Sequence, residues 1–156
     1  MDALKFIALD SEDLEVVSTH LQDAVVRASE VLWRPEEHRL VVALNRFDWE
    51  AATTTRSPEY RRRRAALRFE RVQSCKCKGL KPPAGDDAVL NLLSVEFTPT
   101  DEPAGTVTLY FSGGGALRLE VECLEAELAD LGPTWTTATC PAHADGELTG
   151  QTPRRV

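Results

Sequence analysis

Three segments between residues 93 and 121 alternate apolar and polar side chains, and short connections join them. Alternation with a period of two is the pattern of a strand with one buried face, whereas an amphipathic helix repeats its apolar residues every three or four positions. The glycine run 113–115 links the second segment to the third, as in an antiparallel hairpin. The alternating apolar residues are Leu93, Val95, Phe97, Val107, Leu109, Phe111, Leu117, Leu119 and Val121. The centre of the chain therefore predicts an antiparallel sheet.

Helical spacing occurs at two places, one on each side of this sheet. Residues 10–24 begin with two candidate capping side chains, Asp10 and Ser11, and then place Leu14, Val17, Leu21 and Ala24 on one face. Residues 122–131 predict a second helix that ends at Gly132-Pro133, with an apolar face formed by Leu124, Leu128 and Leu131. Trp135 is then expected to return to the core.

The remaining apolar segments predict three more strands. Two are expected between residues 25 and 47, around a proline-containing turn, and one over residues 62–78, with a bulge near Glu70–Arg71. Residues 48–60 and 79–87 contain the turn-forming residues of loops. No helical crossover separates consecutive strands, which argues against a parallel sheet.

These elements predict an α+β fold, with a curved antiparallel sheet or partly closed barrel of about six strands and one helix near each end. The outline is similar to the pleckstrin-homology-like fold, in which a helix follows the last strand and caps one end. A chain of 156 residues that is 42% hydrophobic can form a core without disulfides or metal. We expect residues 1–143 to form one globular domain and residues 144–156 to be a disordered tail.

Positive charge is concentrated in one segment of an acidic chain. The net charge is −7, yet residues 56–81 carry ten bases and two acids, whereas residues 82–147 carry one base and twelve acids. One interpretation is an exposed surface that binds an unknown acidic protein or other anionic ligand. The alternative is internal, because an acidic protein needs basic side chains to neutralise its own carboxylates. The candidate surface comprises Arg61, Arg62, Arg63, Arg64, Arg68, Arg71 and Lys76.

Nucleic acid is a poor candidate for the partner. The acidic remainder of the chain would repel a phosphate backbone, and no aromatic side chains are interleaved with the arginines to stack on bases. The glycines at 113–115 join two strands and are not followed by a Lys-Ser/Thr pair, so they match no nucleotide-binding motif.

Two chemical alternatives rest on cysteine and histidine. Cys75 and Cys77 could bind zinc together with Cys140 and His143, although Cys-x-Cys on a regular strand fits structural zinc poorly. A small enzyme could use His20 or Cys123 near a junction of helix and sheet, but four nearby acids oppose formation of a thiolate at Cys123. We therefore expect no catalytic residue, no bound metal and no cofactor.

The N-terminus lacks the basic start and longer apolar core of a secretory signal, and no apolar run reaches the length of a transmembrane helix. These features predict a cytoplasmic protein. The oligomeric state cannot be inferred from the sequence.

Four stretches together are similar to a known family: LDSEDLEVVSTHLQDAV, LNRFDWE, LRFERV and GGGALRLEVECLEAELADLGPTWTT with the later PAH. They resemble a small bacterial domain-of-unknown-function family, number 2948, over residues 4–143, most specifically over residues 119–135. The resemblance implies an alphaproteobacterial source. It transfers no functional residue, because the family has no assigned activity, substrate or cofactor. The function expected from the residues is a non-catalytic binding or scaffold module.

Overall fold

The structure is a computed structural model that describes residues 4–47, 61–79, 88–131 and 135–136. Within these ranges the chain forms one α-helix, α1 (Ser11–His20), two short 3-10 helices, η1 (Pro35–Glu37) and η2 (Ser112–Gly114), and ten strands. The strands are β1 (Lys5–Ala8), β2 (Ala24–Arg34), β3 (Arg39–Phe47), β4 (Arg61–Phe69), β5 (Val72–Lys78), β6 (Val89–Pro99), β7 (Gly105–Phe111), β8 (Ala116–Val121), β9 (Ala126–Asp130) and β10 (Trp135–Thr136).

All strand pairs are antiparallel, in the order β1-β9-β4-β3-β2-β6-β7-β8-β5, and β10 pairs with β4. The sheet is curved and open, because no pairing among the described residues joins β1 to β5. The antiparallel sheet predicted from the alternating segments is thus confirmed. The predicted number of about six strands is wrong.

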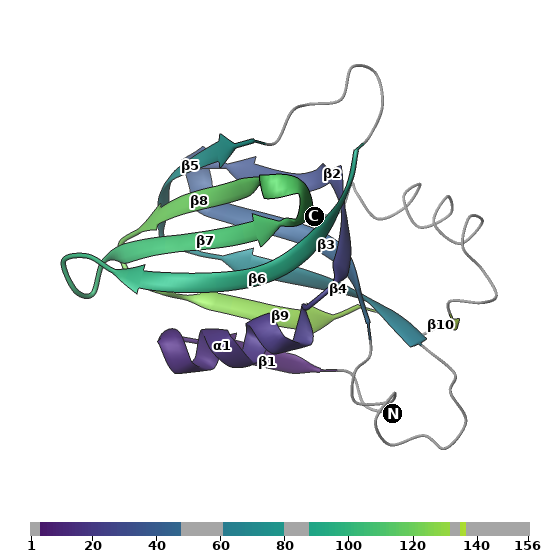
Figure 1. Cartoon of the computed structure of the whole chain (residues 1–156). Coiled ribbons are helices and arrows are strands. Elements are labelled where there is room, and N and C mark those ends of the chain that lie inside the picture. The colour runs from purple at the N-terminus through teal and green to yellow at the C-terminus, as the bar shows by residue number, and fades with distance from the viewer. Residues whose placement is uncertain (1–3, 48–60, 80–87, 132–134, 137–156) are drawn as a thin grey trace.

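Strand β2 turns the single sheet into two layers. Its first part, Ala24–Arg27, pairs with β6, and Val25 and Val26 also pair with β3, whereas its second part, Val31–Arg34, pairs with β3 alone. An irregularity between Val26 and Val31 lets the strand bend. In Figure 1 the β6-β7-β8-β5 layer consequently faces the layer that contains β4, β3 and β2. The alternating apolar side chains of both layers, including Leu67 and Leu119, form the buried core between them.

Helix α1 fills one corner of this open barrel, where it packs against β6 and β1 (Figure 1). Asp10 caps its first turn by accepting a hydrogen bond from the amide of Asp13 at 2.8 Å. Leu14 and Val17 are buried beneath the helix. The predicted N-terminal helix is confirmed, but it ends at His20, and Ala24 already belongs to β2.

The segment predicted as one strand over 62–78 is two strands. Arg71 has a left-handed backbone (φ 61°), which ends β4 at Phe69 and redirects the chain into β5. The amide of Glu70 donates to the carbonyl of Glu125, and the carbonyl of Arg71 accepts from Glu122. The sequence therefore located the irregularity correctly at Glu70–Arg71, but this irregularity is a break between layers rather than a bulge.

The helix predicted over 122–131 is wrong, because residues 126–130 form strand β9. This strand lies between β1 and β4, so both of its edges have hydrogen-bonding partners. Ala126 and Leu128 face the core with the two-residue period of a strand. Trp135 is in β10 and pairs with Arg62 through the backbone. The described chain has one α-helix, at its start, and the pleckstrin-homology-like topology stays a prediction.

Candidate binding surface

The inward-facing part of the basic segment forms a buried ionic cluster. Arg46 and Arg63 lie opposite each other on β3 and β4, and both side chains are at most 4% exposed. The fully buried carboxylate of Asp130 accepts from Arg46 Nε at 2.9 Å and Nη2 at 3.0 Å, and lies 3.8 Å from Arg63 Nη1. It also accepts from the amide of Leu4 at 2.7 Å. Arg63 is therefore part of the interior and not of an exposed surface.

Arg64 forms a second ionic group on the opposite face of β4. Its guanidinium donates to the carboxylate of Glu30 and, at 3.2 Å, to the side-chain oxygen of Asn45. The side chains of Arg64 and Glu30 are both less than a tenth exposed. Arg64, like Arg63, is thus matched by an acid of its own chain.

The next two predicted cations are exposed but also paired. Arg68 is bound to Glu70 at 2.9 Å and contacts Glu127. Arg71 lies 3.5 Å from Glu125 and 3.8 Å from Glu122. These ion pairs favour the second interpretation of the basic segment, in which its cations neutralise carboxylates of the same chain.

Arg61 and Arg62 occupy the start of β4. Arg62 is half-buried, with its guanidinium 5.8 Å from the centre of the Phe47 ring, and it donates to the carbonyl of Asn45. Burial lowers the pKa of Arg62, and the charge of Asp23 acts in the opposite direction. Arg61 pairs with Thr136 through the backbone, and its side chain lies outside the described part of the structure.

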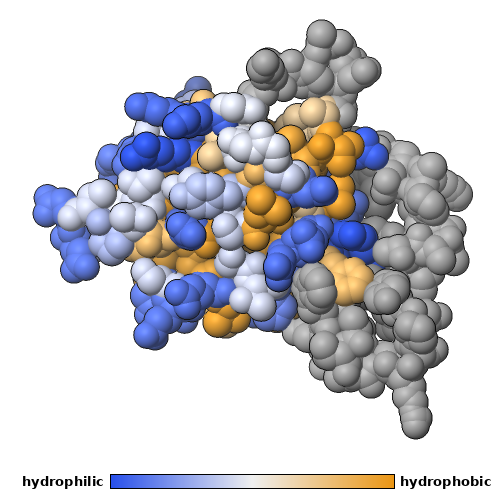
Figure 2. Space-filling model, viewed as in Figure 1, coloured by the Kyte–Doolittle hydropathy of each residue, from blue (hydrophilic) through white to orange (hydrophobic). Residues whose placement is uncertain are grey.

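Lys76 has different surroundings from the arginines. Lys76 and Lys78 are exposed on β5, and neither has a carboxylate within ion-pair distance in the described part of the structure. Lys76 lies directly opposite Arg118 of β8, whose side chain is 62% exposed and 3.7 Å from Glu120. We call Lys76, Lys78 and Arg118 the β5 cationic edge. Figure 2 shows a hydrophilic surface on this side of the molecule.

Sequence reasoning missed Arg118 and Lys78 as members of this group. Arg118 is the single base between residues 82 and 147. Because it is far in sequence from the basic segment, its position opposite Lys76 could not be recognised. The alternation of Leu117 and Leu119 already placed Arg118 on the outer face of the sheet. What the sequence lacked was the register that puts Arg118 beside Lys76.

A charged groove of about 650 Å³ lies on the other layer, over β9, β4 and β3. Its floor includes Val41, Ala66 and Ala129, and Arg39 and Arg68 stand at its rim. The rim cations are paired with acids: Arg39, for example, binds Glu70 at 2.9 Å and Glu37 at 3.2 Å. The groove therefore offers less unneutralised charge than the β5 cationic edge does.

The cysteines give no catalytic or metal-binding arrangement within the described ranges. Burial, with a smaller contribution from Cys77, raises the pKa of the half-buried Cys75 to about 11, which opposes thiolate formation. Cys140 and His143, the other two members of the zinc alternative, lie outside the described residues. In the part that is described, no three His, Cys, Asp or Glu side chains are placed to hold a metal ion.

The two residues of the enzyme alternative occupy different elements. His20 lies at the end of α1, with Nδ1 3.0 Å from the carbonyl oxygen of Val16. Cys123 is half-buried in the connection between β8 and β9. Neither residue lines the groove over β9, β4 and β3.

A comparison with protein families identifies a match over most of the chain. The family model described as "Protein of unknown function (DUF2948)" matches residues 4–143. No curated protein and no solved structure matches the chain. No helix in the described ranges has the length and apolar character needed to cross a membrane.

Proposed function

Since the chain belongs to the DUF2948 family, whose function is unknown, we propose from its own surface that it is a non-catalytic binding module for an acidic protein. The contact surface of this proposal is the β5 cationic edge. From the seven residues predicted by sequence it keeps Lys76, and it adds Lys78 and Arg118.

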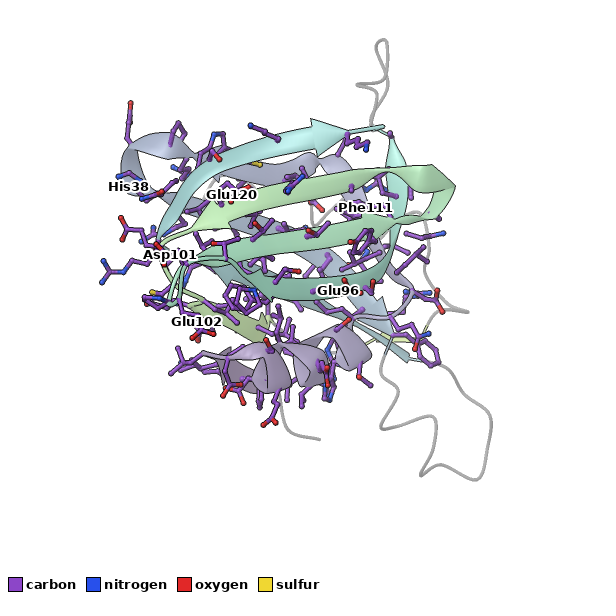
Figure 3. The ribbon with its side chains drawn as sticks, turned by 60° about the vertical axis from the view of Figure 1, so that its left-hand side comes forward. His38, Glu96, Asp101, Glu102, Phe111 and Glu120 are labelled. Atoms are coloured by element: carbon purple, nitrogen blue, oxygen red, sulfur yellow. The ribbon has the colours of Figure 1, made fainter. Side chains whose placement is uncertain are left out.

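The juxtaposition of Lys76 and Arg118 carries the proposal. Like charges directly opposite each other on neighbouring antiparallel strands destabilise a sheet. Here both side chains are exposed, and Lys78 extends the same positive face, in a chain with a net charge of −7. The acid beside them, Glu120, also accepts a hydrogen bond from the hydroxyl of Thr106. Figure 3 shows the position of Glu120 on β8. A carboxylate-rich partner would supply the negative charge that Lys76 and Lys78 lack nearby among the described residues.

Binding of poly-L-glutamate, measured by fluorescence anisotropy at low salt, tests the proposal. Replacing Lys76 and Lys78 with Glu should weaken binding about tenfold or more, because two exposed attractions become repulsions. Lys5→Glu is the control for the single variant Lys76→Glu, which changes the net charge by the same amount: Lys5 is an exposed lysine on β1, the opposite terminal strand, and its replacement should change affinity less than about twofold.

Raising the ionic strength should weaken wild-type binding and reduce the difference between the variants. If Lys76→Glu and Lys5→Glu bind poly-L-glutamate equally, the β5 cationic edge is not the contact surface. If single-stranded DNA binds the wild type as tightly as poly-L-glutamate, the preference for an acidic protein is wrong. The cytoplasmic location stays a prediction.

A further inference from the structure

We propose, on the basis of the proposed function, that the acidic partner binds as an extended strand paired with the outer edge of β5. In this binding mode, main-chain hydrogen bonds would hold the partner, and the lysines would select its sequence.

Within the described ranges, β5 has a strand partner on one side only. Residues Ser74–Lys78 pair regularly with Glu120–Ala116 of β8. β5 is the last strand of the sheet, and no strand in the described part of the chain pairs with its other edge. Figures 1 and 3 both show it at the margin of its layer. In an antiparallel strand alternate amides and carbonyls point to opposite sides, so part of this segment presents unpaired groups outward.

The other terminal strand is less suited to such pairing. β1 has four residues, against seven in β5, and α1 packs against it. The start of β5 is also anchored, because the amide of Val72 donates to the carbonyl of His38 at 2.9 Å. Among the described residues, the part of the edge without a strand partner therefore begins after Val72 and coincides with the segment that carries Lys76 and Lys78.

The lysines make this edge selective. Exposed lysines on an edge strand disfavour pairing with a neutral or basic strand. Lys76 and Lys78 are two residues apart and therefore project from the same face of β5, together with Arg118. A partner strand with an acid at every second position would place its carboxylates on that face. Its intervening residues would lie on the side of Cys75 and Cys77, where small or apolar side chains fit.

The probe is a synthetic octapeptide of alternating Glu and Thr, with two derivatives that are N-methylated at every Glu or at every Thr. N-methylation removes amide donors without changing charge. In an added strand only alternate amides face β5, so one derivative should bind at least tenfold more weakly than the parent and the other should stay within about threefold. Equal binding by the parent and both derivatives would overturn strand addition.

Amide hydrogen exchange, measured by NMR, gives a second readout on the unmodified protein. The parent peptide should slow the exchange of outward-facing amides among residues 74–78 at least tenfold and leave the β1 amides unchanged. If the Lys76→Glu/Lys78→Glu variant loses the peptide while wild-type exchange at 74–78 is unaffected by it, the partner contacts side chains alone; the proposed function then survives and strand addition fails. If the variant and the wild type bind the parent peptide equally, the proposed function fails as well.

Discussion

Asp130 shows how one carboxylate can hold several structural elements. Its side chain, at the end of β9, contacts Arg46 of β3, Arg63 of β4 and the amide of Leu4 before β1. Paired buried charges add little stability relative to apolar residues, but a buried charge that loses its partner is costly. Removing the charge of Asp130 should therefore be costly.

Asp130→Asn should lower the free energy of unfolding by about 3 to 5 kcal/mol, because Asn keeps the shape but removes a buried negative charge that lies against both Arg46 and Arg63. Urea unfolding followed by circular dichroism measures this change. Glu127→Gln is the control, since Glu127 pairs with the exposed Lys5 and the half-exposed Arg68 and should cost about 1 kcal/mol or less. Equal costs for the two variants would contradict the role assigned to Asp130.

Cys75 and Cys77 should differ in reactivity although they are two residues apart. With a pKa raised to about 11, Cys75 is a thiolate in only about one molecule in a thousand at pH 8, and it is half-buried. Its alkylation by iodoacetamide should increase about tenfold per pH unit from pH 8 and level off near pH 11. Peptide mapping by mass spectrometry follows both sites, and the exposed Cys77 should be labelled first at pH 8. Equal labelling rates at pH 8 would contradict the burial of Cys75.

The arginine run illustrates what a sequence reveals at the scale of a residue. Arg63 has the same phase as Ala65, Leu67 and Phe69, so the alternation of β4 places it toward the core. Its partner Asp130 could not be identified, because that contact depends on β9 pairing beside β4. The concentration of charge was evident from the sequence, whereas its distribution between interior and surface required the fold.

Strand β9 shows the corresponding limit for an element. Leu124 and Leu128 are four residues apart, which predicts a helix, but Ala126 and Leu128 also fit the period of a strand. A five-residue segment cannot distinguish the two patterns. Pairing on both edges with β1 and β4 decides in favour of the strand, and these partners are more than fifty residues away in sequence.

Proline substitution can distinguish a central strand from an edge strand by its effect on stability. Ala129→Pro should destabilise the protein by about 3 kcal/mol or more, because both edges of β9 are paired and any lost amide leaves an unsatisfied partner. In β5, Lys76→Pro and Cys77→Pro remove amides that point to opposite sides. One of the two should therefore cost at least about 1 kcal/mol less than the other. Thermal unfolding of the three variants measures these differences, and equal losses at positions 76 and 77 would mean that both edges of β5 are occupied.

At the scale of the molecule, a sheet of this curvature leaves a corner that another element must fill. In the pleckstrin-homology-like outline a helix after the last strand caps one end, but in the described chain α1 fills the corner between β1 and β6. Both segments predicted as helices had apolar stripes, and the sequence could not decide which stripe would be buried against which strands. The contact is specific: Leu14 and Val17 are buried, and Ser18 Oγ accepts from the amide of Val95 at 3.0 Å.

Leu14→Ala should therefore destabilise the molecule by about 2 to 5 kcal/mol, since it leaves a cavity between α1 and the sheet. Val16→Ala, on the exposed side of the same helix, should change stability by no more than about 0.5 kcal/mol. Helix α1 packs against β6 and β1, whereas β7 separates β8 from β6 in the sheet. Amide hydrogen exchange in Leu14→Ala should therefore accelerate more in β1 and β6 than in β8. Uniform acceleration of exchange across all strands would show instead that α1 and the whole sheet unfold as one unit. The effect of the α1 contact would then not be local to β1 and β6.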